Sequence, residues 1–273
     1  MRISRASLAV NGALIFVAAL TVFPLLWMVS ASLMVPGESS SYPPPLWPAH
    51  PTLANYRELV GHTGLARHFL NSLVISVAAT MLALTFNVAA GYAFAKLEFP
   101  GRGRIQQLMV AALVIPAQVA MLPLFLQLKA LGLVNTLAGV LVPSLAGIFS
   151  IFLVRQAAIA IPDELLDAAR IDGASELTIF RRIVLPLLTP MLVTLAVFTF
   201  LGAWNDFLWP LIVLNDGDNY TLPVALASLS REHVQDSELM MAGSVVTVAP
   251  VLLLFLVMQR YYLQGLMAGA VKG

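Results

Sequence analysis

The sequence has little charge and no cysteine. Only 11% of its 273 residues are charged, whereas 59% are hydrophobic. A typical soluble domain carries about 25% charged residues, so this chain lacks the polar side chains that would cover a surface in water. The composition therefore excludes an ordinary soluble domain and indicates an integral membrane protein.

Further absences narrow the possible functions. The lack of cysteine excludes disulfides, thiolate nucleophiles and cysteine-ligated metals. A net charge of +1 offers no basic field for a nucleic acid, and no Gly-x-x-x-x-Gly-Lys-Ser/Thr loop is present to hold a nucleoside triphosphate. We expect no metal site, because the histidines lie in loops or at a loop edge and lack metal-ligand spacing: His50, His62, His68 and His233. We also expect no catalytic residue.

Six apolar stretches are each longer than the roughly 20 residues that a helix needs to cross a bilayer. They cover residues 8–33, 69–95, 105–128, 137–160, 185–214 and 239–264. Pro116 and Pro123 are expected to kink the third of them. The sequence therefore predicts an all-α polytopic membrane protein, with six transmembrane helices in a single domain over residues 1–273.

The basic residues predict the orientation. The first span follows a positive start, but its apolar stretch exceeds the 7–15 residues of a secretory signal, so we expect an uncleaved anchor. Cytoplasmic loops carry an excess of Lys and Arg, and we therefore expect both termini in the cytoplasm. Eleven basic residues would lie on that side and four on the other: Arg2, Arg5, Lys96, Arg102, Arg104, Arg155, Arg170, Arg181, Arg182, Arg260 and Lys272, against Arg57, Arg67, Lys129 and Arg231.

The segment between the fourth and fifth spans, residues 161–186, is too polar for a simple turn. Pro162 is followed by two acidic residues, a pattern typical of a helix start, and Gly173 is suited to end that helix. We expect a second short helix from about Ser175. Pro186 is expected to end it where the chain re-enters the membrane.

This polar segment has two interpretations. It is either an amphipathic hairpin on the lipid headgroups, with Arg181 and Arg182 near phosphates, or a compact surface that fits a groove in a partner. Small residues at Ala168 and Ala169, close to Gly173, favour the protein partner, because lipid does not require a close approach.

The same segment resembles the EAA motif of ABC importer permeases. That motif is Glu-Ala-Ala, three residues, Gly, nine residues and Ile-x-Leu-Pro, and this chain departs from it only by Asp167 in place of Glu. The resemblance implies a two-helix cytoplasmic coupling loop, residues 161–186, that docks on an ATPase subunit. The docking residues that it implies are Asp167, Ala168, Ala169, Asp172, Gly173, Ala174, Phe180, Ile183, Leu185 and Pro186.

Other stretches are similar to the carbohydrate branch of that family, in particular to the shorter second permease of maltose-type systems. They are residues 68–76, 90–102, 203–214 and 259–273. The resemblance implies a non-enzymatic subunit of the bacterial inner membrane that forms half of a path for a sugar or polyol. The implied partners are a second related permease, two copies of an ABC ATPase that hold ATP and Mg, and an extracytoplasmic solute-binding protein. Lipid surrounds the subunit, no cofactor is expected on it, and glycerol phosphate remains an alternative solute.

Asp206 is the one ionisable residue deep in an apolar stretch of this sequence, and it follows Trp204 and Asn205. A carboxylate at mid-membrane costs about 2.5–3.5 kcal/mol on insertion scales. Asp206 is therefore either an interfacial cap on a broken helix or, with Trp204 and Asn205, part of a polar path for the solute.

Two other classes of membrane protein remain open from the residues alone. An ion-coupled secondary transporter normally carries ionisable groups within its spans, often in repeated halves, and this chain offers Asp206 and no visible repeat. A membrane-embedded enzyme would need a cluster of catalytic side chains. The sequence therefore favours the importer over both.

Overall fold

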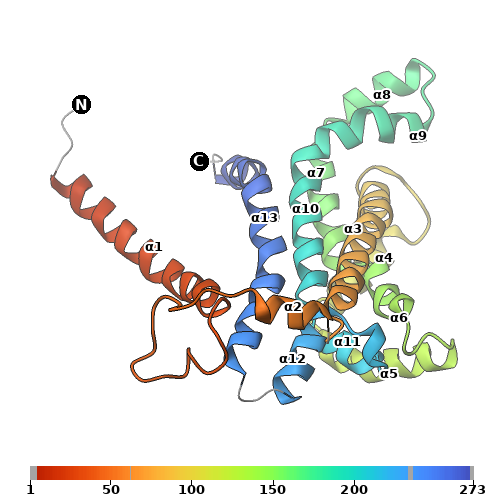
Figure 1. Cartoon of the computed structure of the whole chain (residues 1–273). Helices are drawn as coiled ribbons and strands as arrows, with labels where there is room; N and C mark the ends of the chain where they lie inside the picture. Colours follow the sequence, from red (N-terminus) through yellow and green to blue (C-terminus); the bar gives the residue numbers. More distant parts are fainter. Residues whose placement is uncertain (1–4, 62, 233–235, 271–273) are drawn as a thin grey trace. The chain divides into compact units, whose positions relative to one another are not determined.

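The computed structural model describes residues 5–61, 63–232 and 236–270, and its regular elements over these ranges are all helices (Figure 1). His62, His233, Arg2 and Lys272 lie outside the described residues. The chain divides into two compact units. The first unit comprises the chain up to Arg67 together with Leu222–Pro250, and the second comprises His68–Thr221 together with the chain from Val251 onward.

The first unit is built on a long apolar helix and a loop that folds back on it. From this helix, the Trp27 indole donates to the carbonyl of Pro45 at 3.2 Å, and the Ser30 hydroxyl donates to the carbonyl of Leu46 at 2.6 Å. Both carbonyls belong to the loop. Glu238 is fully buried and accepts from the Ser39 amide at 2.7 Å. The elements of this unit are α1 (Arg5–Ala31), α2 (Ala54–Gly61), α12 (Leu222–Glu232) and the first part of α13 (Ser237–Ala270).

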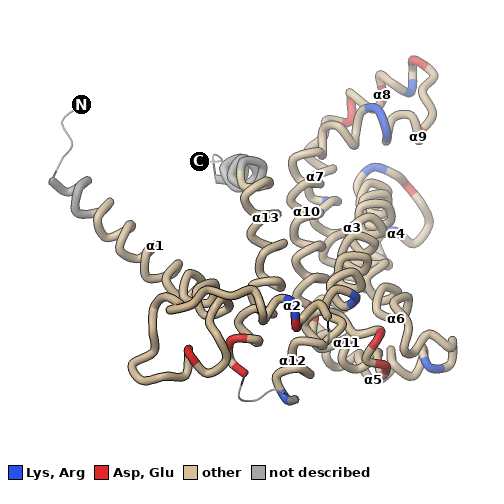
Figure 2. Tube along the Cα trace, in the orientation of Figure 1, with Lys and Arg blue, Asp and Glu red and all other residues tan. Residues whose placement is uncertain are grey.

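The second unit contains the predicted coupling loop. Figure 2 shows that its charged residues gather at its ends, on α8, α9 and the α3–α4 turn at one end and around α5 and α11 at the other. Its elements are most of α3 (Leu65–Lys96), α4 (Arg102–Ala112), α5 (Ala117–Ala130), α6 (Leu137–Leu141), the 3-10 turn η1 (Val142–Leu145), α7 (Ile148–Ile159), α8 (Asp163–Ile171), α9 (Glu176–Ile179), the π-helical turn η2 (Phe180–Val184), α10 (Leu185–Trp204), α11 (Leu208–Val213) and the 3-10 turn η3 (Gly217–Asn219).

The helix α3 packs closely on α7, and the apolar core between them extends into the coupling loop. A Cβ added at Gly91 would lie 2.5 Å from the Cβ of Val154 and 2.9 Å from the carbonyl oxygen of Ile151, so only glycine allows this approach. The same apolar cluster includes Leu166 of α8 and Ile179 of α9, both fully buried. The loop is therefore packed against the spans and is not a free hairpin.

The membrane topology agrees with the predicted class. Among the described residues, five helical stretches are long and apolar enough to cross a membrane, and a sixth is counted if α4 and α5 form one broken span. The five are residues 10–31, 65–96, 137–159, 176–204 and 237–259. The all-α, multi-spanning fold is confirmed for the part of the chain that the structure describes.

The third predicted span, residues 105–128, is not one continuous helix. The structure has α4 and α5 there, bent by 109° across residues 113–116. Proline lacks an amide proton and disfavours a helical residue before it, so Pro116 ends α4 and opens α5, whereas Pro123 is accommodated inside α5. The predicted kink is in fact a break.

The fifth predicted span, 185–214, differs at both ends. The helical path runs without a break from Glu176 to Trp204, so Pro186 does not end a helix as predicted. The π-helical turn η2 explains this. The Leu185 amide donates to the Phe180 carbonyl five residues back, so the α-helical hydrogen-bond pattern is already interrupted before the proline. The C-terminal end is shorter than predicted, since α10 stops at Trp204 and α11 begins at Leu208.

Candidate functional site

The coupling loop reverses direction at a well-formed helix end. Gly173 has φ +82°, the left-handed region that favours glycine. Its amide donates to the Arg170 carbonyl at 3.0 Å, and the Ala174 amide donates to the Ala169 carbonyl at 3.0 Å. This pair of bonds is the Schellman arrangement. It satisfies the last carbonyls of α8 and sets the direction in which the chain leaves, as the glycine pattern predicted.

The second helix of the loop starts at a side-chain cap. The Ser175 hydroxyl accepts from the Thr178 amide at 3.3 Å, and the two hydroxyls lie 2.9 Å apart. The cap satisfies one of the free amides at the start of the helix. The predicted start near Ser175 is confirmed.

Arg170 joins the two helices of the loop. Its Nη1 donates to Asp167 Oδ1 at 2.7 Å within α8, and its Nε donates to Glu176 Oε1 at 2.6 Å at the start of α9. The hydrogen bond that Arg170 donates to Glu176, and then the one that it donates to Asp167, raises the pKa of Arg170 above its ordinary value. One guanidinium therefore holds both carboxylates across the glycine turn.

The C-terminal end of α3 contacts both helices of the loop. Lys96 Nζ donates to the Ile161 carbonyl and to Asp163 Oδ1, both at 2.6 Å, and its side chain is only 5% exposed. Tyr92 donates to Glu176 Oε2 at 3.0 Å. The hydrogen bond from Lys96 is the main reason why the pKa of Asp163 lies below its ordinary value.

These contacts were not predicted from the sequence. Tyr92 and Lys96 are four residues apart at the end of a span and so share one face of the helix, which is the signal that was available. Their partners, Glu176 and Asp163, are 84 and 67 residues away in the chain. Only the tertiary structure brings them together.

The predicted docking residues lie along one continuous segment and differ in exposure. The structure brings apolar side chains to the surface beside them, with Ile171 at 86% exposure and Leu177 at 56%. Exposed apolar side chains next to charges are typical of an interaction surface. The exposed docking residues are Asp167, Ala168, Asp172, Gly173 and Pro186, and the half-buried ones are Ala169, Ala174, Phe180, Ile183 and Leu185.

The break at residues 205–207 uses its polar groups locally. Asn205 Nδ2 donates to the Leu201 carbonyl at 2.9 Å, and Asp206 Oδ1 accepts from the Trp209 amide at 3.4 Å. Trp204 is fully buried, with its ring 5.5 Å from that of Phe69. Asp206 therefore contacts the first turn of α11, as a cap would, while its alternative place in a solute path stays a prediction.

A cavity of about 320 Å³ lies between α3, α7 and α10. Its wall carries an amide, three hydroxyls and two phenyl rings, and none of its residues is charged. Trp204, Asn205 and Asp206 are not among them, although the lining reaches the residue before Trp204. The lining residues are Ala79, Ala83, Asn87, Ser144, Gly147, Phe149, Ser150, Leu153, Leu195, Phe198, Thr199, Gly202 and Ala203.

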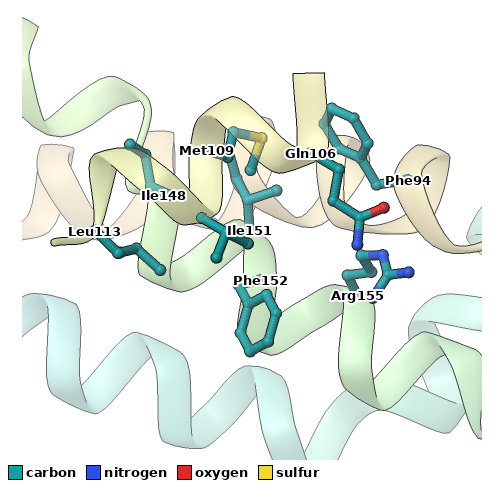
Figure 3. Close-up of a pocket in the computed structure, with 9 residues that line it drawn as sticks. Phe94, Gln106, Met109, Leu113, Ile148, Ile151, Phe152 and Arg155 are labelled. Carbon is teal, nitrogen blue, oxygen red and sulfur yellow. The ribbon is translucent and has the colours of Figure 1, made fainter. Parts of the chain in front are cut away.

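A second, smaller pocket between α3, α4 and α7 is structural. Figure 3 shows Gln106 of α4 and Arg155 of α7 pointing toward one another at one end, beside Phe94. With its amide oxygen turned to the guanidinium, Gln106 accepts from Arg155 at 3.0 Å. The free volume of about 10 Å³ is the space of roughly one water molecule. This pocket ties α4 to α7 and does not hold a solute.

Comparison with known proteins gives matches over most of the chain. The family model described as "Binding-protein-dependent transport system inner membrane component" matches residues 87–267. The chain is 41% identical to the arabinooligosaccharides transport system permease protein of Halalkalibacterium halodurans, over 94% of each chain. It is 35% identical to the diacetylchitobiose uptake system permease protein of Streptomyces coelicolor, over 90% of this chain and 83% of that one.

Solved structures show the same fold. The crystal structure of a bacterial ABC transporter involved in the import of the acidic polysaccharide alginate matches with a TM-score of 0.83 and 23% identity. The match covers 95% of this chain and 98% of that chain. At this identity the likeness concerns the arrangement of the helices alone.

Proposed function

The chain belongs to the family of binding-protein-dependent transport system inner membrane components and is a permease subunit of an ABC importer, and on this premise we propose that its solute is a neutral sugar or polyol. The membership favours the importer over the ion-coupled transporter and the membrane-embedded enzyme. Relatives named for arabinooligosaccharides and diacetylchitobiose support a carbohydrate. The observation that carries the proposal is the uncharged cavity between α3, α7 and α10.

The cavity has room for a sugar, and its mainly apolar wall carries a few polar groups. At about 320 Å³ it falls at the lower end of the ~300–1,000 Å³ typical of ligand pockets. Asn87, Ser144, Ser150 and Thr199 supply donors and acceptors for hydroxyl groups. We propose that the path continues past Ala203 toward the helix break at Trp204, Asn205 and Asp206, and that the Asp206 carboxylate holds this break as a helix cap and does not itself bind the solute.

The same lining argues against an anionic solute such as glycerol phosphate. A phosphate in a water-poor site needs basic side chains or free amides to offset its desolvation, and no Lys or Arg lines the cavity. A neutral polyol has no such need.

The coupling loop is proposed to dock on a separate ATPase subunit, which holds ATP and Mg. The proposed docking residues are Asp167, Ala168, Ala169, Asp172, Gly173, Ala174, Phe180, Ile183, Leu185 and Pro186. What supports this role is a loop that is both exposed and stiff: Ile171 and Leu177 offer apolar contact area, and the Arg170 ion pairs and the two helix caps resist deformation. A stiff element is required to transmit a motion without losing it.

The assembly is proposed to contain a second related permease, two copies of the ATPase and an extracytoplasmic solute-binding protein. The coupling-loop end of the second unit is proposed to face the cytoplasm, together with both termini. Lys96, Arg102, Arg104, Arg155, Arg170, Arg181 and Arg182 lie on the segments at that end, and this excess favours the cytoplasmic side.

The test places a larger side chain in the cavity from α10. Thr199→Phe, which lines the cavity, should abolish ATP-driven uptake of arabinooligosaccharide into proteoliposomes that contain the complete importer and its binding protein. Thr189→Phe is the matched control, because Thr189 lies exposed on the same helix and away from the cavity. Equal uptake by both variants would place the solute elsewhere, and uptake of glycerol phosphate in place of the sugar would overturn the neutral-solute proposal.

A further inference from the structure

The end of α3 contacts the coupling loop at two separate places. Lys96 reaches the chain just before α8, at Ile161, and the first residue of α8, at Asp163. Tyr92 reaches the first residue of α9, at Glu176. Because Tyr92 and Lys96 are one helical turn apart, the two contacts leave α3 from the same face.

The loop itself joins those two places. Arg170 bonds to Glu176 on α9 and to Asp167 on α8, so the start of α9 is tied both to α8 and to α3. Tyr92 and Phe180 add a ring contact, with centroids 5.2 Å apart. The helix α3 and the two loop helices are therefore connected by a closed set of contacts, which prevents the loop from turning about any one of them.

The two α3 side chains are more buried than the acidic side chains of the loop in these contacts. The Lys96 side chain is 5% exposed and Tyr92 is 4% exposed, whereas the side chains of Asp163, Asp167 and Glu176 are 75%, 62% and 46% exposed. A buried polar group that loses its partner keeps the cost of its desolvation, and an exposed one regains water. Separation of α3 from the loop is therefore costlier than a change of partner at Asp167.

From the loop contacts, α3 runs back to the wall of the cavity. Ala79, Ala83 and Asn87 of α3 line its wall, and Asn87 precedes Tyr92 by five residues, about 7.5 Å along a helix. Asn87 Oδ1 also accepts from the Gly147 amide at 3.2 Å, at the start of α7. A displacement of α3 at its cytoplasmic end therefore reaches the cavity wall within two turns.

We propose that Tyr92 and Lys96 are positioning residues that make α3 move with the coupling loop as one body. When the loop moves, it then displaces two helices that line the cavity. It moves α10 because the chain continues into that helix, and it moves α3 because Tyr92 and Lys96 hold α3 to the loop. This inference rests on the proposed docking of the loop. If the covalent chain alone transmitted the motion of the loop, only α10 would move. The proposal adds α3 to the helices that move during transport.

The test separates motion from assembly. Tyr92→Phe combined with Lys96→Met removes the three hydrogen bonds and keeps the side-chain volume. In proteoliposomes with binding protein and ATPase, we expect the sugar moved per ATP hydrolysed to fall about tenfold, the order expected when hydrogen bonds to charged groups are lost. The ATPase should still co-purify. Lys96→Arg alone, which keeps the charge and the donors, should retain most of the coupling. Lys129→Met, at an exposed lysine away from the loop, should leave the coupling unchanged.

A distance measurement reports the motion itself. The chain has no cysteine, so spin labels can be placed at Ala89→Cys on α3 and Glu164→Cys on α8, both exposed positions. We expect the distance between the labels to stay constant when ATP is added to the otherwise unchanged importer, and to change on ATP binding when Tyr92→Phe and Lys96→Met are also present. An ATP-dependent change in both backgrounds would overturn the proposal.

Failure of the inference can be told from failure of the docking. If the double variant transports with unchanged coupling while Gly173→Pro loses the ATPase, the loop docks but α3 is not driven by it. If Gly173→Pro keeps both the ATPase and uptake, the docking on which the inference rests is wrong.

Discussion

The coupling loop and the break at residues 205–207 are both polar interruptions of an apolar chain, yet they are built differently. In the loop, Arg170 and Glu176 join separate helices and reach α3 through Tyr92. At the break, Asn205 and Asp206 bond to backbone groups three or four residues away. Polar groups that bridge helices can carry a displacement between them, whereas polar groups that bond locally only end and restart a helix.

The largest effect is expected at the loop reversal. Gly173→Pro places a residue with φ near −65° where +82° is required, and it removes the amide that bonds to Arg170. Uptake and co-purification of the ATPase should both be lost, while the protein stays in the membrane. Gly173→Ala, with a strain of about 1–2 kcal/mol, should give partial loss. Gly103→Ala, at an uncrowded glycine of α4, is the control; normal uptake by the proline variant would contradict the docking assignment.

A smaller but still clear effect is expected from breaking the bridge between the loop helices. Arg170→Met removes both ion pairs and leaves Glu176 without its cation. Both pairs are partly exposed, so water offsets much of the loss, and we expect uptake to fall severalfold with the fold intact. Arg182→Met, at an exposed position of the same segment, should transport normally. If the two variants behave alike, the bridge has no role in coupling.

The break should respond as a cap does. Asp206→Ala removes the acceptor for the Trp209 amide and should cost about 1 kcal/mol of stability, measured as a lower melting temperature in detergent with uptake little changed. Asp206→Asn keeps a carbonyl acceptor and should recover the stability. Loss of uptake by a stable Asp206→Ala protein would instead favour a place for this carboxylate in the solute path, and would remove the contrast between the two regions.

The smallest effect is expected at the cap of α9. Ser175→Ala removes the bond to the Thr178 amide, and an N-cap serine contributes about 1 kcal/mol. Because Glu176 and the buried Ile179 also hold this helix, we expect a small decrease in the melting temperature and nearly normal uptake. Thr178→Val, which keeps the Ser175 cap, should be milder still. A severe transport defect in Ser175→Ala would show that the start of α9 tolerates no loosening.

Local chemistry explains which elements could be predicted. The spans at 69–95 and 239–264 follow from long, mainly apolar stretches of sequence, and the loop reversal follows from a single glycine. The prolines were harder, because the same residue has opposite results in two settings. Pro116 lies between α4 and α5, bent by 109°, and Pro186 lies in a continuous helix because a π-helical turn precedes it. Nothing in the local pattern distinguishes the two.

The sequence by itself determined that this chain crosses a membrane and carries a polar two-helix loop between two spans, because hydropathy, proline and glycine act through neighbours a few residues apart. Only the tertiary structure decided which helix that loop holds and where an uncharged cavity opens. Tyr92 and Glu176 are separated by 84 residues, and the cavity draws on three helices; such proximity results from packing, which no short stretch of sequence records.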